Sequence, residues 1–181
     1  MKHNIEYTHK NIKLLPISQK DIEQLRHWRN DGNLTKYLSK IDYITKEKQS
    51  IWYQKDLENK DCYSFAIHET NELNGIIGSV ALYHFDKKCV EFGRLIIGNT
   101  HARRRGYGYL ATALCLQVAF EEFNVDEVVA YVYEENISAL SSYKKAGFRV
   151  LKKDERNELE IKITKKEFLS LKENTWTQHN T

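Results

Sequence analysis

The sequence predicts an α+β protein in which a mixed β-sheet carries helices on both faces. Three strand-like segments joined by short polar turns fill the middle of the chain, at 62–69, 76–85 and 89–97, and they indicate an antiparallel meander. A long apolar helix is expected to follow at 110–123. After it, strand and helix patterns alternate up to a closing hairpin, which completes the mixed architecture.

The chain has the size and composition of a single domain. Its 181 residues are enough to bury a substantial core, and its one proline argues against long linkers. We therefore expect one domain over 1–181, with its core at about 12–164 and a loose tail at 173–181.

The first elements are expected to be a short strand and a helix. Ile12 and Leu14 suggest a strand that ends at Pro16. Ser18 and Asp21 then have the spacing of a capping box, with Asp in place of the usual Glu or Gln, and they predict that a helix starts here.

Two helices are predicted in the N-terminal part of the chain. The first has an apolar stripe and ends at the turn signal of 30–32. The second starts near Thr45. Their stripes consist of Ile22, Leu25 and Trp28 in the first helix, and Ile51, Trp52 and Leu57 in the second.

The second half of the chain supplies the rest of the sheet. The helix at 110–123 is apolar around most of its circumference, so we expect it to be buried against the sheet. A strand at 127–133 precedes a helix that Gly147 closes at its C-terminal end. The alternating segment at 159–163 would then pair with 148–153 as the final hairpin.

Charge and cysteine content exclude several classes of protein. A net charge of +3 spread among acidic residues is too small for a nucleic-acid-binding protein. The three cysteines are isolated, which argues against disulfides and a thiolate metal site, and no metal is expected. No apolar run is long enough for a membrane span or a signal peptide, so a cytoplasmic protein is expected, with a homodimer left open.

The basic segment 100–113 could serve three kinds of partner. A nucleic-acid surface needs basic residues spread over a face, and here they are clustered before an apolar helix. Gly106, Gly108 and Ala111 fit a dinucleotide fingerprint literally, but Asp126 and Glu127 fall before the next strand rather than at its end. The third reading is a diphosphate cradle at a helix N-terminus. A solvated basic loop remains the alternative without a ligand.

Two motifs favour the diphosphate cradle because they resemble one enzyme family. The segment 103–108 resembles the Q/R-x-x-G-x-G/A signature of the GNAT acyltransferase superfamily, and 136–148 resembles its N-x-x-A-x-x-x-Y-x-x-x-G-F segment. The resemblance covers the chain from about Leu14 to Ile163. It implies an acetyl-CoA-dependent N-acetyltransferase whose mostly antiparallel sheet splays into a V between 89–97 and 127–133.

The resemblance also implies how coenzyme A is held. Backbone amides of the loop would bind the pyrophosphate, and the edge of one central strand would pair with the pantetheine arm. An amide near Ile96 would polarise the thioester carbonyl. The implied coenzyme-binding residues are Leu95, Ile96, Ile97, Arg103, Arg104, Arg105, Gly106, Tyr107, Gly108, Tyr109 and Asn136.

Acetyl transfer to an amine requires a proton acceptor and a proton donor. An amine with a pKa near ~10.4 is mostly protonated at neutrality, and the leaving thiol gains from a proton donor. Tyr143 matches the family position of the general acid, with core packing as its alternative role. Glu91 is the preferred base, Glu134 is the competitor, and a water relay is a third option. His84 and His101 are further candidates on their ordinary pKa.

The acceptor is expected to contact the N-terminal helices. Residues 27–30 resemble a segment of the branch that holds ribosomal-protein N-terminal and amino-sugar acetyltransferases. Trp28, Arg29 and Glu134 are the candidate acceptor-binding residues, although a packing role as a helix anchor is favoured for Trp28. An amino-sugar nucleotide is the favoured acceptor, because aromatic residues could stack on its rings. A peptide N-terminus, a polyamine or an aminoglycoside, and a non-catalytic acyl-CoA-binding module are the alternatives.

Overall fold

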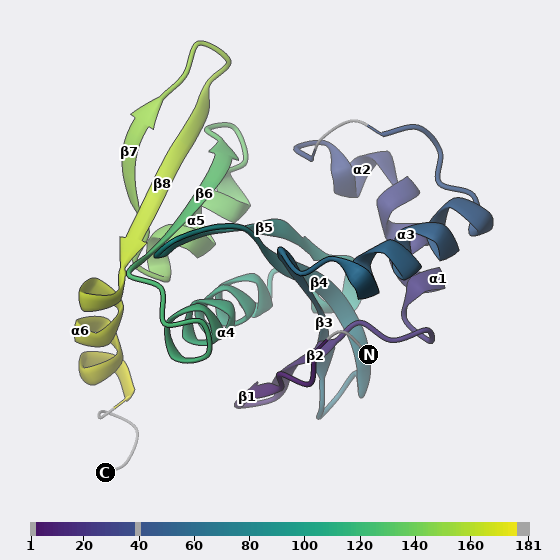
Figure 1. The fold of residues 1–181 in the computed structure, drawn as a ribbon, viewed down its shortest axis with the longest axis horizontal. Coiled ribbons are helices and arrows are strands. Elements are labelled where there is room, and N and C mark those ends of the chain that lie inside the picture. The colour runs from purple at the N-terminus through teal and green to yellow at the C-terminus, as the bar shows by residue number, and fades with distance from the viewer. Residues whose placement is uncertain (1–2, 39–40, 177–181) are drawn as a thin grey trace.

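The computed structural model describes residues 3–38 and 41–176, with only the backbone described for 173–176. The chain contains both strands and helices, arranged as an α+β protein (Figure 1). In chain order they are β1 (Tyr7–His9), β2 (Ile12–Pro16), α1 (Ile22–Asn30), α2 (Gly32–Thr35), α3 (Lys46–Glu58), β3 (Cys62–Glu69), β4 (Gly75–Asp86), β5 (Cys89–Ile97), a 3-10 turn (Thr100–Ala102), α4 (Tyr107–Glu121), β6 (Glu127–Tyr133), α5 (Ile137–Lys145), β7 (Arg149–Lys153), β8 (Glu158–Thr164) and α6 (Lys165–Trp176).

The eight strands form one sheet in the order β1-β2-β3-β4-β5-β6-β8-β7. All neighbouring strands are antiparallel except β5 and β6, which run parallel. This parallel pair is joined only at its start, where Cys89, Val90 and Glu91 oppose residues 127–129. Beyond this point the two strands part, and the sheet splays into the expected V (Figure 1).

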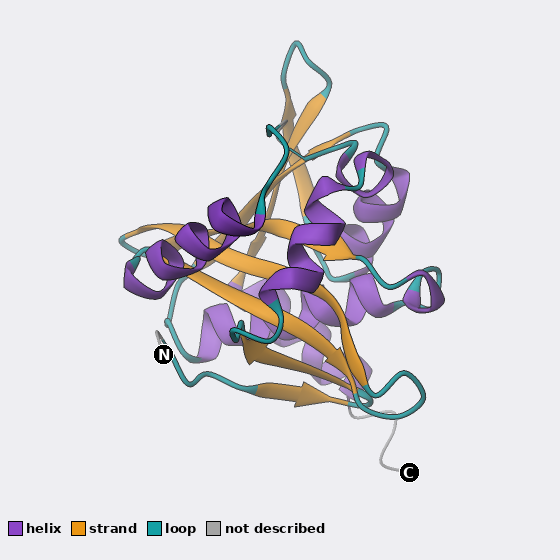
Figure 2. Ribbon diagram, turned by 90° about the vertical axis from the view of Figure 1, so that its right-hand side faces the viewer, coloured by secondary structure: helices purple, strands orange, loops and turns teal. Residues whose placement is uncertain are grey.

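Helices cover both faces of the sheet, as the sequence predicted (Figure 2). Helix α4 packs on one face, where its apolar residues join Phe65 and Ile67 of β3 in the main core. Helices α1 and α3 cover the opposite face, where Leu25 and Trp28 pack with Ala66 and Ile96 in a second core. Alternate residues of β3 thus point into different cores, as strand geometry requires.

Most of the predicted elements are confirmed. The meander, the strand 127–133, the helix closed by Gly147 and the final hairpin all lie where the patterns placed them. Gly147 has φ +102°, the left-handed conformation that a helix C-terminus favours. Helix α4 is buried on most of its surface but begins at Tyr107, three residues before the expected start.

Other boundaries differ from the prediction. Helix α1 begins at Ile22, and the Asp21 carboxylate accepts hydrogen bonds from both the amide and the hydroxyl of Ser18, at 2.8 and 2.6 Å. The turn signal at 30–32 ends α1 but also starts the short α2, because Asp31 accepts a hydrogen bond from the Asn33 amide. Strand β1 and helix α6 were not predicted. Helix α6 continues beyond the expected core limit at residue 164, and 177–181 lie outside the described residues.

Candidate active site

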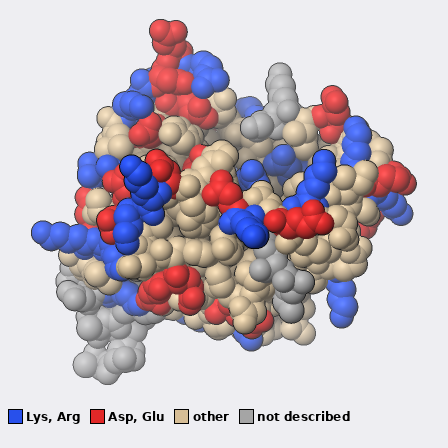
Figure 3. Space-filling model, viewed as in Figure 1, with Lys and Arg blue, Asp and Glu red and all other residues tan. Residues whose placement is uncertain are grey.

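A cavity of about 1350 Å³ opens where β5 and β6 part. Its walls come from both strands, from the N-terminal ends of α4 and α5, and from α1 and α3 on the other side. The volume exceeds the roughly 300–1,000 Å³ of common ligand pockets, so it has room for more than one bound molecule. Basic side chains are visible in the hollow between the β7–β8 hairpin and the N-terminal helices (Figure 3).

The loop before α4 presents unpaired backbone amides to this cavity. Arg104 and Gly106 have φ values of +59° and +81°, and such left-handed residues turn successive amides toward one side. Leu110 is the first residue of this helix with a hydrogen-bonded amide; none of the amides of 104–109 donates to another described group. Together with the positive end of the α4 dipole, they form a site for an anionic group.

The arginines of this loop have different environments. Arg103 donates from Nε to the Ile97 carbonyl at 3.3 Å and from Nη2 to the Gly98 carbonyl at 3.0 Å, so it ties the loop to the end of β5. Arg104 is exposed and lines the cavity. The Arg105 side chain pairs with Glu72 at 2.6 Å and does not line the cavity, which leaves its backbone amide as the group expected to contact the coenzyme.

The cavity-facing end of β5 is distorted by a β-bulge. On β4, Ser79 and Ala81 are two residues apart, but their partners on β5, Ile96 and Gly93, are three apart. The bulge contains Arg94, whose φ of +55° is left-handed. Beyond the bulge, residues 95–97 pair with β4 on one side only and line the cavity, so their other edge is available to an extended ligand.

Tyr143 lies on α5 with its ring in the core and lines the cavity. The ring packs edge-on against Phe92 at a centroid distance of 5.4 Å, and it also contacts Phe148. Its hydroxyl makes no hydrogen bond to any described residue. Burial raises the pKa of Tyr143 above its ordinary value, so the phenol keeps its proton and can act only as a donor.

Glu91 faces the same cavity from the start of the V. Its side chain is 19% exposed, and one carboxylate oxygen lies 2.8 Å from Nδ1 of His84. Burial is the main cause that raises the pKa of Tyr83, and the Glu91 carboxylate raises it further. The Glu91 carboxylate is therefore paired with His84 of β4 while it remains open to the cavity.

Small side chains form the floor of the cavity on the α1 and α3 side. Ser64 opposes Ala81, and Ala81 opposes Gly93, so all three lie on one face of the sheet, with Ser79 two residues along the same strand. Gln49 and Trp52 of α3 form part of the roof. Because these floor side chains are small, space for a ligand remains between the sheet and the helices.

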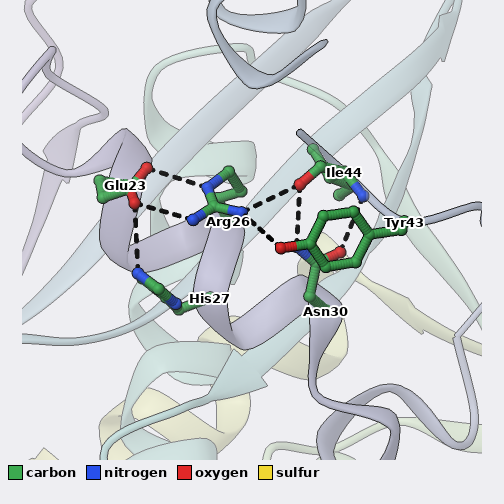
Figure 4. Close-up of polar contacts among 6 residues, drawn as sticks. All are labelled: Glu23, Arg26, His27, Asn30, Tyr43 and Ile44. Atoms are coloured by element: carbon green, nitrogen blue, oxygen red, sulfur yellow. Dashed lines mark hydrogen bonds and ion pairs between the residues drawn. The ribbon is translucent and has the colours of Figure 1, made fainter. Parts of the chain in front are cut away.

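The roof is fastened to α1 by a polar cluster (Figure 4). Arg26 is buried and donates to Glu23 at 2.9 and 2.8 Å, to the Tyr43 hydroxyl at 3.3 Å and to the Ile44 carbonyl at 3.1 Å. Asn30 exchanges two hydrogen bonds of 2.9 Å with the backbone of Ile44. The segment leading into α3 is therefore held at a fixed distance from α1.

Four of the predicted site residues lie elsewhere or have other partners. Trp28 is 8% exposed and packs its ring against Gly98, outside the cavity lining. Tyr109 packs beside the core beneath Lys145 and does not line the cavity either. Glu134 is exposed and pairs with Lys153 at 2.7 Å. Asn136 lines the cavity, but its carboxamide oxygen caps α5 through the Ala139 amide at 3.2 Å.

Sequence reasoning missed several residues that line the acceptor side. Gly93 and Arg94 were assigned only to a strand, and the floor residues and Gln49 were not singled out. An isolated glycine inside a strand pattern is a signal for a bulge, and it could have indicated that Arg94 is displaced from the regular alternation. Nothing in the sequence indicates that the bulge lies opposite α1.

Within 3–38 and 41–176, no three His, Cys, Asp or Glu side chains are grouped so that they could hold a metal ion. No helix in the same ranges is long and apolar enough to cross a membrane.

Residues 11–149 match the acetyltransferase (GNAT) domain family. Acetyltransferase PseH of Campylobacter jejuni is 25% identical to this chain over 138 residues, which cover 76% of this chain and 83% of PseH. The fold is also similar to two solved structures. One is spermidine N-acetyltransferase from Vibrio cholerae in complex with CoA and spermine, with a TM-score of 0.79, 18% identity, and coverage of 89% of this chain and 99% of that one.

The second solved structure is apo FdhC, described as a nucleotide-linked sugar GNAT. Its TM-score is 0.79 at 19% identity, and the match covers 95% of this chain and 97% of FdhC. These likenesses show that the splayed sheet and the helices around it follow a known arrangement.

Proposed function

Because the chain belongs to the acetyltransferase (GNAT) family and is an N-acetyltransferase that uses acetyl-CoA, we propose that its acceptor is a small primary amine, and we favour an amino-sugar nucleotide. One observation carries the catalytic part of the proposal. The Tyr143 hydroxyl and the Glu91 carboxylate line the same cavity, on the two sides of the point where β5 and β6 part. A proton donor and a proton acceptor thus lie where a thioester and an amine would meet.

The donor side fits coenzyme A by its own geometry. The unpaired amides of 104–109 suit a pyrophosphate, and a Cβ on Gly106 would meet nothing within 4 Å, so the space in front of the loop is open. The free edge of residues 95–97 suits the extended pantetheine arm. When bound, acetyl-CoA supplies the acetyl group as a thioester. The Ile96 amide is the proposed donor to its carbonyl oxygen.

The protein's residues move two protons in this proposal. Glu91 accepts the proton that the attacking amine loses, while His84 holds the carboxylate. Tyr143 donates its proton to the departing sulfur. Tyr143 suits this role because its hydroxyl has no competing partner among the described residues, and its raised pKa keeps the proton on the phenol until the sulfur departs.

The side chains on the acceptor side support a ring-bearing acceptor. Trp52, Tyr37, Tyr131 and Tyr133 line the cavity and offer faces for a sugar or a base. The relatives include a spermidine enzyme and a nucleotide-linked sugar enzyme with equal TM-scores, so the choice between them is made from the cavity itself. A peptide N-terminus is the second candidate, and this matches the resemblance of residues 27–30 to the ribosomal-protein branch.

Thiol release tests the proposal. The purified protein is incubated with acetyl-CoA and one amine at a time: an amino-sugar nucleotide, the free amino sugar, spermidine and a short peptide. CoA production is followed with a thiol reagent. We expect the fastest release with the amino-sugar nucleotide. If CoA binds tightly in calorimetry but none of the amines leads to production of CoA from acetyl-CoA, the chain is a binding module and the proposal fails.

A further inference from the structure

We infer that the acceptor half of the cavity contains an anion-binding subsite formed by Arg29 of α1 and Arg94 of the β5 bulge, and that the acceptor amine therefore carries a phosphate or diphosphate. The inference rests on the proposed function, since it concerns the same cavity, and it adds the charge class of the acceptor. Its strongest support is that no acidic side chain among the described residues pairs with Arg29.

Arg29 is a half-buried guanidinium that lines the cavity. It makes no hydrogen bond, ion pair or ring contact with any described residue. Burial lowers the pKa of Arg29, and the positive charge of Arg94 lowers it further. Guanidinium groups stay protonated in proteins, so Arg29 keeps its positive charge despite its burial and the nearby charge of Arg94.

The neighbouring Arg26 shows what a satisfied arginine looks like in this helix. Glu23, Tyr43 and the Ile44 carbonyl take up its donors (Figure 4). Arg29, three residues on, has no such acceptors. An uncompensated charge in a half-buried position is costly, and this cost is offset when an anionic ligand binds.

Arg94 reaches the same face of the sheet because of the bulge. Its guanidinium lies 4.3 Å from the centroid of the Tyr83 ring, and Nη1 lies 3.5 Å from the Cys62 sulfur. Cys62 and Tyr83 are cross-strand partners and Tyr83 opposes Glu91, so Arg94 lies over the floor of the acceptor half. No carboxylate among the described residues pairs with it either.

Gln49 supports the subsite from the roof. It is 5% exposed and lines the cavity, and its carboxamide makes no hydrogen bond to any described residue, while its backbone amide donates to the Thr45 carbonyl at 3.0 Å. The carboxamide therefore supplies a further donor for an oxygen-rich ligand.

The arrangement selects for a particular acceptor chemistry. Two guanidiniums bind phosphate oxygens through several charge-assisted hydrogen bonds, whereas a polycation such as spermidine would be repelled. Glu91 is three residues before Arg94 on β5, which places the base and the anion site within about 10 Å along the strand. One small molecule can therefore present an amine to Glu91 and a phosphate to the arginines.

The test measures anion binding without turnover. Uridine diphosphate and inorganic pyrophosphate are titrated by calorimetry into protein saturated with CoA, so that the loop at 104–109 is already filled. We expect both to bind. Arg29→Gln should weaken binding at least about tenfold, the loss of one charge-assisted contact of about 1.4 kcal/mol, and Arg29→Lys should recover part of it. Arg149→Gln, an exposed arginine paired with Glu167, is the control and should bind as the wild type does.

A second readout separates binding from folding. Because Arg29 has no partner in the described part of the chain, Arg29→Gln should raise the Tm of the ligand-free protein. A lower Tm, or equal binding of both anions by the wild type and Arg29→Gln, would overturn the inference.

The two proposals fail in different ways. If no amine releases CoA while uridine diphosphate still binds through Arg29, the proposed function fails and the subsite stands. If spermidine is acetylated equally well by the wild type and Arg29→Gln, the subsite is excluded while acetyl transfer stands.

Discussion

Tyr143 and Glu91 show at the scale of single residues how packing prepares chemistry. The Tyr143 ring is fixed by Phe92 and Phe148, while its hydroxyl is left without a partner among the described residues. Glu91 has the opposite arrangement, since its carboxylate lies 2.8 Å from Nδ1 of His84. In the proposed mechanism, Tyr143 would donate its proton to the leaving sulfur and Glu91 would accept the proton of the amine.

Tyr143→Phe should remove the donor and keep the ring contacts. We expect kcat to fall about a hundredfold, while the KM for acetyl-CoA changes less than about twofold. Steady-state thiol release gives both numbers. Tyr53→Phe, which removes a buried hydroxyl outside this cavity, is the control. An unchanged kcat would remove Tyr143 from the mechanism.

The same residue sets the expected alkaline behaviour of the enzyme. The donor is the neutral phenol, and burial raises the pKa of Tyr143 above its ordinary value of 10.0, so the active form persists up to and beyond that pH. We therefore expect no loss of kcat below about pH 10 through this group. An alkaline decline at lower pH that disappears in Tyr143→Phe would contradict the raised pKa.

Glu91 and Glu134 can be separated by a matched pair of substitutions. Glu91→Gln should lower kcat/KM for the amine at least about tenfold, because the proton acceptor is lost while the shape is kept. Glu134→Gln should leave kcat/KM unchanged, since this carboxylate pairs with Lys153 away from the cavity. The reverse result would move the base to Glu134, and no effect in either variant would favour a water relay.

At the scale of elements, the loop before α4 is supported from behind by the end of β3. Glu69 is 1% exposed and accepts hydrogen bonds from Asn11 Nδ2 at 2.8 Å and from the Leu73 amide at 2.6 Å. Asn11 Nδ2 also donates to the Tyr107 hydroxyl at 2.9 Å. This network therefore positions the first turn of α4. Neither Glu69 nor Asn11 lines the cavity.

The two glycines of this loop should fail for different reasons when substituted. Gly106→Val forces a side chain to adopt φ +81°, at a cost of about 1–2 kcal/mol, although the space around it is open. Gly108→Val pushes a side chain toward Ser142 Oγ, which lies 3.2 Å from the position of a Cβ. We expect both variants to lose CoA binding in calorimetry. Gly32→Val, at another open position, should bind normally, and intact binding by the loop variants would refute the cradle.

At the scale of the whole molecule, the buried Glu69 carboxylate couples stability to pH. Burial alone would raise the pKa of Glu69, but hydrogen bonds from Leu73, Asn11, Asn71 and Asn74 lower it below its ordinary value of 4.5. The folded state thus binds this proton less readily than the unfolded state does. The resulting stabilisation is present above the ordinary pKa and is lost as the pH falls through the folded pKa.

Glu69→Gln should therefore lower the free energy of unfolding at pH 7 and make it less sensitive to acid. Urea denaturation at pH 7 and at about pH 4 measures both effects. The exposed Glu155→Gln is the control and should follow the wild type. A parallel acid dependence in Glu69→Gln and the wild type would show that other carboxylates govern the acid response.

Features that depend on contiguous residues could be predicted from the sequence, whereas contacts between residues distant in sequence could not. The meander strands and the loop at 103–108 follow from contiguous patterns, so their places were predicted. Helix α2 was missed because Gly32 and its neighbours signal a stop. Trp28 and Glu134 were considered for the acceptor site, but their environments depend on Gly98 and Lys153, distant in sequence. Arg94 lies over the acceptor half of the cavity only because a bulge displaces it from the regular alternation of β5.

The short pairing of β5 with β6 has a mechanical consequence. Only residues 89–91 and 127–129 join the two halves of the sheet across this seam. A pantetheine arm bound along 95–97 would act as a temporary strand that extends the seam. Backbone hydrogen exchange in β6 and β8 should then slow when the coenzyme binds, although neither strand's fold changes. The ligand would thus contribute to the rigidity of the sheet that binds it.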